Sequence, residues 1–177
     1  VQILNILENI DLGKLDHNSE EYLKLLISAM DYAYRDRAKF LGDPEFFDVP
    51  QDLLTSKKYA DEIYHQIQEK KYPSKATVNI LEGEETTHFS IVDKWGNAVS
   101  NTYTLNTAYG SGIIPTGTGI LMNNEMDDFS SKPGYPNAYG LIGSEANKIE
   151  PKKTPLSSMS PVIVLHNEKP YLITGSP

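Results

Sequence analysis

The chain has 177 residues, enough to bury a hydrophobic core, of which 39% are hydrophobic and 23% are charged. No apolar run is long enough to span a membrane, and the net charge of -8 argues against nucleic acid or an anionic membrane as a partner. Cysteine is absent, which excludes disulfides, thiol nucleophiles and cysteine-based metal sites.

The first part of the chain is predicted to be helical. Apolar residues recur at helical spacing over residues 3–10, and a second helix is expected from residue 18 or 19 to Gly42. One face of the second helix carries an apolar stripe that consists of Leu23, Leu26, Ile27, Met30, Ala33 and Tyr34. A third helix is predicted over residues 55–71. Its inward-facing side chains are expected to be Tyr59, Ile63 and Ile67, together with the preceding Leu54.

The second part of the chain is predicted to form two β-hairpins. Residues 88–105 are rich in β-branched and aromatic residues around a turn at residues 93–97, and residues 160–174 repeat this pattern around residues 166–169. Between them lies a segment rich in Gly, Pro, Asn and Ser, residues 106–155. Such long irregular segments are usually functional or disordered. Helices followed by strands favour an α+β fold.

The sequence lacks the short motifs of several enzyme classes. It contains no Gly-rich phosphate loop before a helix, no HExxH zinc motif and no GxSxG nucleophile motif. The four histidines are spread without the spacing of metal ligands, so surface or structural roles are the simpler interpretation. Nothing local favours a Ser-His-Asp triad.

One stretch is unusual, because an acidic loop runs directly into Thr86-Thr87-His88-Phe89-Ser90 at a strand start. Taken alone, this pattern is best explained by hydroxyl groups that cap exposed backbone groups. Its spacing does not by itself reveal a nucleophile.

This stretch, followed by Asp93-Lys94-Trp95-Gly96-Asn97-Ala98-Val99-Ser100, resembles the start of the small subunit of γ-glutamyltranspeptidases. The resemblance continues in order through residues 102–106, 123–129, 155–161 and 175–177, and Leu41-Gly42-Asp43-Pro44 is similar to the end of the large subunit. It implies part of the αββα four-layer sandwich of N-terminal-nucleophile hydrolases. Residues 1–85 would belong to the large subunit and residues 86–177 to the catalytic small subunit.

The resemblance also implies that the precursor cuts itself at the Glu85–Thr86 bond, which makes Thr86 the nucleophile. Cleavage frees the α-amino group of Thr86, and an amine with a pKa of about 7.7–8.0 can accept the hydroxyl proton near neutrality. Thr104 matches the residue whose hydroxyl orients the nucleophile. A hairpin agrees with this role, since Thr86 begins one strand and Thr104 ends the next, although strand propensity would also explain a threonine there.

Further matches imply a pocket for the γ-glutamyl group. Asn106, Glu125 and Asp128 match residues that hold its α-amino group, while Ser157 and Ser158 match the pair that binds its α-carboxylate. Without the family blocks around them, these residues would be interpreted as ordinary turn and loop residues.

The segment of residues 132–140 resembles a loop that covers this pocket in bacterial members, with Tyr139 as the shielding residue. The resemblance places an oxyanion-hole glycine pair after Pro177 and a carboxylate-binding arginine before Val1. We therefore expect the chain to be part of a longer protein and to be inactive in transpeptidation on its own.

The implied activity is γ-glutamyl transfer and hydrolysis, with glutathione or glutamine as donors, water, amino acids or peptides as acceptors, and no metal or organic cofactor. The expected partners are these small molecules and the remainder of the two subunits, in a periplasmic or secreted location. One alternative is a related acylase or poly-γ-glutamate-processing enzyme with the same threonines and a different acyl pocket. Another is a relative that only binds.

Overall fold

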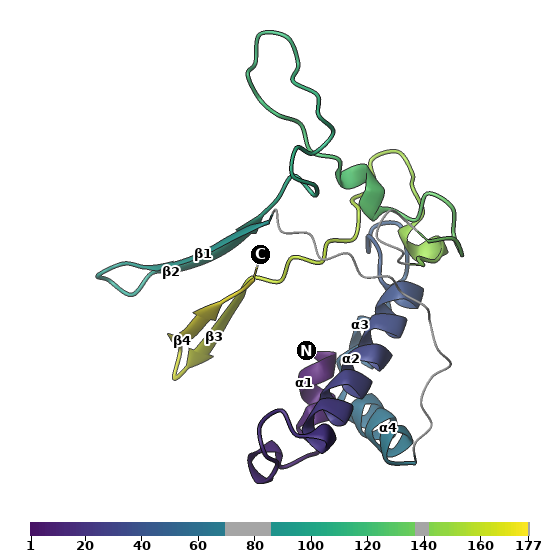
Figure 1. The fold of residues 1–177 in the computed structure, drawn as a ribbon, viewed down its shortest axis with the longest axis vertical. Coiled ribbons are helices and arrows are strands. Elements are labelled where there is room, and N and C mark those ends of the chain that lie inside the picture. The colour runs from purple at the N-terminus through teal and green to yellow at the C-terminus, as the bar shows by residue number, and fades with distance from the viewer. Residues whose placement is uncertain (70–85, 137–141, 177) are drawn as a thin grey trace. The chain divides into compact units, whose positions relative to one another are not determined.

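The computed structural model describes residues 1–69, 86–136 and 142–176. They fall into two compact units that alternate along the chain (Figure 1). The described parts of Val1–Asn79 and Ser130–Thr154 form the first unit, and those of Ile80–Phe129 and Pro155–Pro177 form the second. The predicted division between residues 85 and 86 concerns where the chain would be cut, which is a different boundary, and it stays a prediction.

Helices α1 (Gln2–Leu7), α2 (Glu20–Phe40), α3 (Gln51–Leu54) and α4 (Lys57–Gln68) build the first unit, with the short 3-10 helices η1 (Leu12–Lys14) and η3 (Glu145–Asn147). Serines cap the two longest of these helices. The Ser19 Oγ accepts a hydrogen bond from the Tyr22 backbone N–H at 3.2 Å, and the Ser56 Oγ accepts one from Tyr59 at 3.1 Å. Both predicted helix starts are thus confirmed.

Helix α1 is shorter than predicted. The side-chain amide of Asn9 donates to the carbonyl oxygens of Asn5 and Ile6, each at 3.2 Å. The backbone N–H of Asn9 bonds to Ile6 at 3.3 Å, in the tighter 3-10 pattern. The asparagine therefore occupies carbonyls that a continuing α-helix would use, and α1 ends at Leu7.

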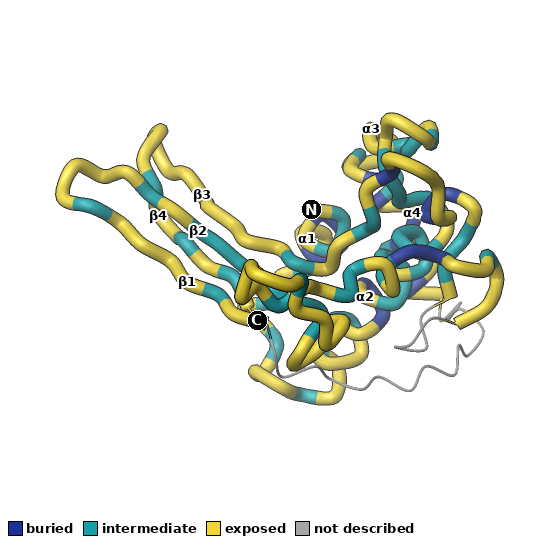
Figure 2. The backbone as a smooth tube through the Cα atoms, turned by 90° about the horizontal axis from the view of Figure 1, so that it is seen from above, coloured by how far each residue is buried: buried dark blue, intermediate teal, exposed yellow. Residues whose placement is uncertain are grey.

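The core of the first unit lies where α1, α2 and α4 meet (Figure 2). It consists of Ile6, Leu7, Ala29, Ala60, Ile63 and Ile67. The predicted inward positions of α4 are confirmed for Ile63 and Ile67, and Leu54 is buried as well. In α2, by contrast, Leu26 packs on the core while most of the apolar stripe is exposed, with Ile27 at 62%. A helix with apolar residues on several sides buries only the side that faces its neighbours, and here this side centres on Ala29.

The residues after α2 contact η3 and the segment that follows it. A Cβ atom at Gly42 would lie 2.1 Å from the carbonyl oxygen of Ala146, so this close approach requires glycine. Asp43 accepts hydrogen bonds from the backbone N–H groups of Thr154 at 2.8 Å and Glu45 at 3.0 Å. These bonds, with that of Thr154 the larger cause, lower the pKa of the Asp43 carboxyl. The block around Gly42 and Asp43 therefore has a structural function.

The second unit contains two antiparallel hairpins, β1 (Thr87–Val92) with β2 (Ala98–Tyr103) and β3 (Val162–His166) with β4 (Lys169–Thr174). Asp93 closes the first turn by accepting hydrogen bonds from the backbone N–H groups of Trp95 at 2.8 Å and Asn97 at 2.9 Å. The second turn is shorter than predicted. Asn167 and Glu168, with φ of 50° and 63°, reverse the chain by themselves.

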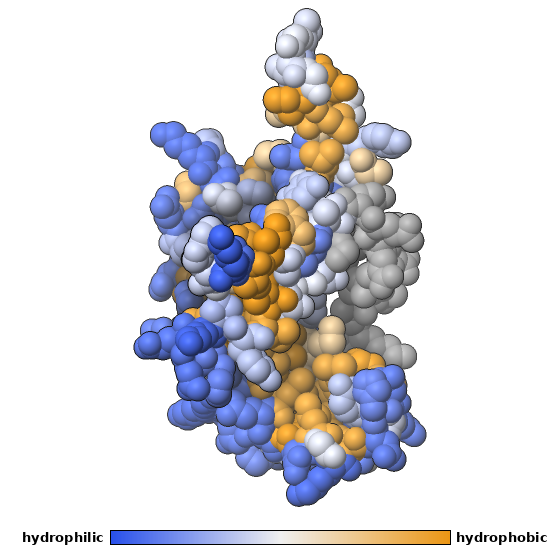
Figure 3. Space-filling model, turned by 90° about the vertical axis from the view of Figure 1, so that its left-hand side faces the viewer, coloured by the Kyte–Doolittle hydropathy of each residue, from blue (hydrophilic) through white to orange (hydrophobic). Residues whose placement is uncertain are grey.

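Between the hairpins the described residues are irregular, as predicted, apart from η2 (Glu125–Asp128) and η3. Both hairpins leave large apolar side chains exposed, among them Ile91, Leu165 and Tyr171. Hydrophobic surface is visible in orange in Figure 3. Within the described ranges, no helix combines the length and apolar character needed to cross a membrane.

Candidate active site

The pairing of β1 with β2 brings Thr86 and Thr104 together. Thr87 lies opposite Tyr103, so the residues just outside the ladder face each other across the hairpin. The Thr86 hydroxyl donates a hydrogen bond to the Thr104 Oγ1 at 3.1 Å. The Thr104 Oγ1 also accepts one from the Asn106 backbone N–H at 2.9 Å. A single oxygen atom thus contacts both the predicted nucleophile and a predicted substrate-binding residue.

Asn106 connects this pair to the turn that precedes η2. It adopts a left-handed conformation with φ of 78°, which asparagine tolerates better than most residues. Its side-chain amide donates to the Asn124 carbonyl at 3.3 Å, and the Asn124 backbone N–H donates to the Leu105 carbonyl at 3.1 Å. The Asn124 Oδ1 in turn accepts from the Thr107 backbone N–H at 3.2 Å. These bonds hold the start of η2 beside the end of β2.

The two predicted ammonium-binding carboxylates, Glu125 and Asp128, both lie in η2. Residues three apart are eclipsed on a 3-10 helix, so these side chains share one side of it. Both residues are half-buried, whereas Met126 and Asp127 are exposed. This places two acidic groups on one side of a turn that is bonded to Asn106, an arrangement suited to a cationic group.

Ser157 and Ser158 lie in the extended segment before β3, in the same unit as the threonines. Both residues are exposed. The Ser157 Oγ accepts a hydrogen bond from the Met159 backbone N–H at 3.1 Å, and the Ser158 carbonyl accepts one from the Ser160 hydroxyl at 3.4 Å. Local hydrogen bonds thus shape the chain around both serines.

Two predicted residues, Glu85 and Tyr139, lie outside the described residues. The cleaved bond and the covering loop accordingly stay predictions. Among the residues that the structure describes, no group of three or more His, Asp or Glu side chains could hold a metal ion.

His88 is a residue that sequence reasoning did not single out. Its Nδ1 lies 2.7 Å from the Thr102 Oγ1 and its Nε2 lies 3.0 Å from the Ser90 Oγ. The signal that could have found it is alternation. Every second residue from Thr86 to Ser90 is polar, and their partners across the hairpin are polar as well.

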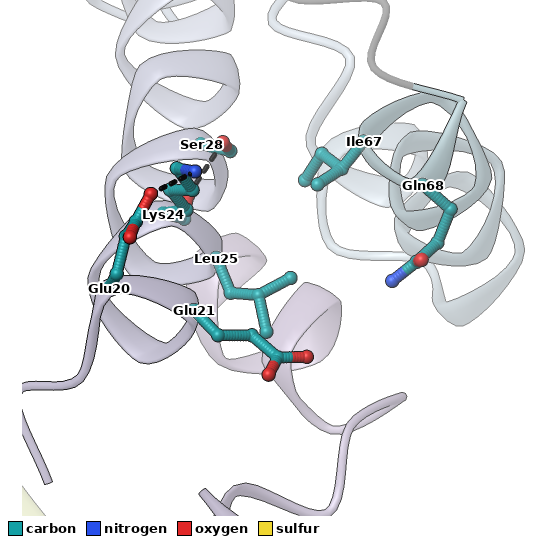
Figure 4. Close-up of a pocket in the computed structure, with 7 residues that line it drawn as sticks. All are labelled: Glu20, Glu21, Lys24, Leu25, Ser28, Ile67 and Gln68. Atoms are coloured by element: carbon teal, nitrogen blue, oxygen red, sulfur yellow. Dashed lines mark hydrogen bonds and ion pairs between the residues drawn. The ribbon is translucent and has the colours of Figure 1, made fainter. Parts of the chain in front are cut away.

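A groove of about 350 Å³ lies in the first unit, between α2 and α4. Its lining consists of Glu20, Glu21, Lys24, Leu25, Ser28, Ile67 and Gln68 (Figure 4). Lys24 and Glu20 form an ion pair at 2.5 Å, and the Ser28 hydroxyl donates to the Lys24 carbonyl at 2.7 Å. None of the predicted site residues lines this groove.

Comparison with known proteins identifies the chain's relatives. Residues 1–177 match the family model for γ-glutamyltranspeptidase. The whole chain is 51% identical to a glutathione hydrolase proenzyme of Escherichia coli, of which it covers 31%. It is also 36% identical, over 99% of its length, to the acylase ACY 1 proenzyme of a Pseudomonas species, of which it covers 30%.

The fold is similar to that of a cephalosporin acylase from Bacillus halodurans, with a TM-score of 0.71 and 24% identity over 97% of this chain and 29% of that chain. The predicted α+β fold is thereby confirmed, and the chain supplies part of it. It spans less than a third of the length of the two curated relatives named above. The match over residues 1–177 and the 51% identity together show that this chain belongs to the γ-glutamyltranspeptidase family.

Proposed function

We propose that the full-length protein transfers and hydrolyses γ-glutamyl groups with Thr86 as its nucleophile. The observation that carries this proposal is the 3.1 Å hydrogen bond from the Thr86 hydroxyl to Thr104, in a chain related throughout to glutathione hydrolase proenzymes. The bond fixes a hydroxyl at the residue whose own amino group would be freed by cleavage.

The first step is cleavage of the Glu85–Thr86 peptide bond. The Thr86 oxygen attacks the Glu85 carbonyl carbon, the hydroxyl proton passes to the peptide nitrogen, and this nitrogen leaves as the α-amine of Thr86. The resulting ester between Glu85 and the Thr86 oxygen is hydrolysed by water, which releases the Glu85 carboxylate and restores the hydroxyl. A weak nucleophile thereby acquires a base on the same residue.

The second step is transfer of the γ-glutamyl group. The free α-amine takes the hydroxyl proton while the Thr86 oxygen attacks the γ-carbonyl carbon of the donor, and the leaving amine accepts a proton as its bond breaks. This forms a γ-glutamyl ester on Thr86. Water then releases glutamate, or the amino group of an amino acid or peptide takes the acyl group. Thr104 orients the Thr86 hydroxyl through their hydrogen bond.

Substrate recognition is assigned to the residues around η2 and before β3. We infer that Asn106, Glu125 and Asp128 hold the α-ammonium of the donor and that Ser157 and Ser158 bind its α-carboxylate. The support is the bonded connection from Thr104 through Asn106 to the start of η2. Tyr139 is proposed to cover the pocket, glutathione and glutamine to be donors, and the location to be periplasmic or secreted. The remaining parts of the two subunits would complete the enzyme.

Intact mass of the full-length protein and of its Thr86→Ala variant tests the nucleophile. We expect the unmodified protein to yield two pieces, one of which begins at Thr86, and the variant to stay whole. If the unmodified protein stays whole, or if the variant is cleaved at the same bond, Thr86 is not the self-processing nucleophile.

A second candidate activity is that of an acylase, because the ACY 1 relative matches 99% of the chain at 36% identity. The higher identity of 51% to a glutathione hydrolase favours the γ-glutamyl donor. Such an acylase would keep Thr86 and Thr104 but would not need acidic groups for an α-ammonium. Comparing γ-glutamyl-p-nitroanilide with glutaryl-p-nitroanilide, which lacks the α-amino group, separates the two. Faster turnover of the glutaryl compound would favour the acylase, and cleavage without turnover of either would favour a protein that only binds.

A further inference from the structure

One face of the first hairpin is polar at the end nearest Thr86, up to the Ser90–Ser100 pair. Side chains alternate between the two faces of a strand, so Thr86, His88 and Ser90 lie on one face. The residues opposite them on the partner strand continue the pattern: His88 pairs with Thr102 and Ser90 with Ser100. The other face carries apolar residues such as Phe89 and Ile91. The polar side chains on this face need hydrogen-bond partners.

His88 is the centre of this polar face. Its Nδ1 lies 2.7 Å from the Thr102 Oγ1 on the opposite strand, and its Nε2 lies 3.0 Å from the Ser90 Oγ on its own strand. Both ring nitrogens are thus engaged, and either tautomer is satisfied because a hydroxyl can donate or accept. Only the Thr87–Tyr103 pair separates the His88–Thr102 pair from the Thr86–Thr104 contact.

The chain just after β4 packs on this ring. A Cβ atom at Gly175 would lie 2.2 Å from Cε1, 2.5 Å from Nδ1 and 2.9 Å from Nε2 of His88. The backbone at Gly175 therefore contacts the imidazole so closely that no side chain fits between them. Beside it, the Ser100 hydroxyl donates to the Thr174 carbonyl at 2.9 Å. The end of β4 is held on the polar face by both contacts.

We propose that His88 is a positioning residue for Thr86, which it fixes by holding the start of β1 against the backbone at Gly175. The proposal rests on the proposed role of Thr86 as nucleophile. Thr86 lies outside the strand ladder, which begins at Thr87, and cleavage would make it a chain end. Chain ends are poorly ordered unless they are tied down. The first fixed side chain on the same face is that of His88, whose ring nitrogens are engaged elsewhere, so its role is positioning and not proton transfer.

The first test measures chain cleavage, and afterwards kcat and KM for γ-glutamyl-p-nitroanilide, in the full-length protein. We expect His88→Ala to lower the cleavage rate and kcat by about tenfold to a hundredfold with little change in KM, because a misplaced nucleophile reacts slowly after substrate has bound. His88→Asn should restore part of the loss, since its amide can still reach Thr102. Thr87→Val, on the opposite face, is the matched control and should stay within about twofold, the ordinary scatter of a neutral exchange.

The second test isolates the contact with Gly175. Gly175→Ala should lower kcat, because its methyl group would clash with the imidazole ring. In the His88→Ala background the ring is gone, so adding Gly175→Ala should cost little further activity. Losses that multiply independently would overturn the proposal, as would His88→Ala with kcat unchanged.

Thermal unfolding midpoints separate positioning from misfolding. A variant that unfolds earlier but is fully active below its midpoint would show that His88 is only structural and would overturn the proposal. Thr86→Ala distinguishes failure of the proposed function from failure of the positioning role. If it still cleaves itself and turns over substrate, the proposed function fails; if it is inactive while the His88 variants behave as the unmodified protein, only the positioning role fails.

Discussion

Replacing Thr104 by valine exchanges its hydroxyl group for a methyl group of similar size. The hydroxyl oxygen accepts hydrogen bonds from the Thr86 hydroxyl at 3.1 Å and from the Asn106 backbone N–H at 2.9 Å. Thr104→Val therefore releases the predicted nucleophile and leaves the backbone N–H of Asn106 without this acceptor. We expect a lower rate constant for self-cleavage, a lower kcat and, because Asn106 is loosened, a higher KM.

The size of the effect follows from the two lost bonds. Each neutral hydrogen bond contributes about 0.5–1.5 kcal/mol, so the pair contributes about 1–3 kcal/mol. Since about 1.4 kcal/mol corresponds to a factor of ten, kcat/KM should fall by about fivefold to a hundredfold if most of this energy supports the reacting geometry. The fall should divide between kcat and KM, because only the Thr86 bond acts on the nucleophile.

The assay follows self-cleavage of the full-length protein by intact mass over time and turnover of γ-glutamyl-p-nitroanilide afterwards. Thr104→Ser keeps the oxygen and loses only a methyl group, so it should retain activity within about threefold. Two results would refute the reasoning: Thr104→Val with unchanged kcat/KM, or Thr104→Ser as damaging as Thr104→Val. The first would mean the bond is incidental, and the second would mean that the methyl group matters.

Three predictions concern the first unit, each checked by urea unfolding of the full-length protein. Ile63→Ala should lower the unfolding free energy by about 2–5 kcal/mol, because a side chain of 1% exposure leaves a cavity, and a loss below about 1 kcal/mol would contradict this. Gly42→Ala should destabilise by about 1–3 kcal/mol, since its Cβ would lie 2.1 Å from the Ala146 carbonyl oxygen, whereas an unchanged midpoint would show that the backbones separate freely. Hydrogen bonds to the Asp43 carboxylate, that of Thr154 first, lower its pKa in the folded state below 3.8, so its stabilisation is complete above that value and is lost as the pH falls through the lowered pKa. Asp43→Asn should therefore be less stable at neutral pH and converge with the unmodified protein in acid; a constant difference would refute the linkage.

Local features of the chain could be predicted from the sequence, because local chemistry determines them. Ser19 and Ser56 identify helix starts, since a hydroxyl before an apolar repeat satisfies the first free N–H groups. Asp93 and Gly96 identify the turn between β1 and β2, because the Asp93 carboxylate accepts a hydrogen bond from the backbone N–H of Trp95 and Gly96 adopts a positive φ. The end of α1 was missed, because the asparagine that ends it acts through two side-chain bonds that periodicity does not reveal.

The assembly of distant segments could not be predicted from periodicity or composition. Residues 130–154 return to the helical unit through contacts such as Ala146 against Gly42 and Thr154 with Asp43. Each contact joins residues about a hundred positions apart, and neither segment carries a sequence pattern that identifies the other. The alternation of polar residues from Thr86 to Ser90 was visible, but the partner of His88 at Gly175 was not. The family resemblance named the candidate site, since spacing alone left Thr86 as an ordinary strand start.

Placing the nucleophile on the residue that also supplies the base reduces what the fold must arrange. The amine and the hydroxyl of Thr86 would be joined through two carbon atoms, so their separation depends mainly on one side-chain torsion and not on packing between distant segments. What the fold must supply is restraint on a single residue at a free chain end. The hydrogen bond to Thr104 restrains the hydroxyl, and the ladder that begins at Thr87 restrains the backbone. His88, fixed by Thr102, Ser90 and Gly175, prevents that ladder from opening at the end where the chemistry would occur. An N-terminal nucleophile on a hairpin is therefore only as precise as the first two pairs of that hairpin.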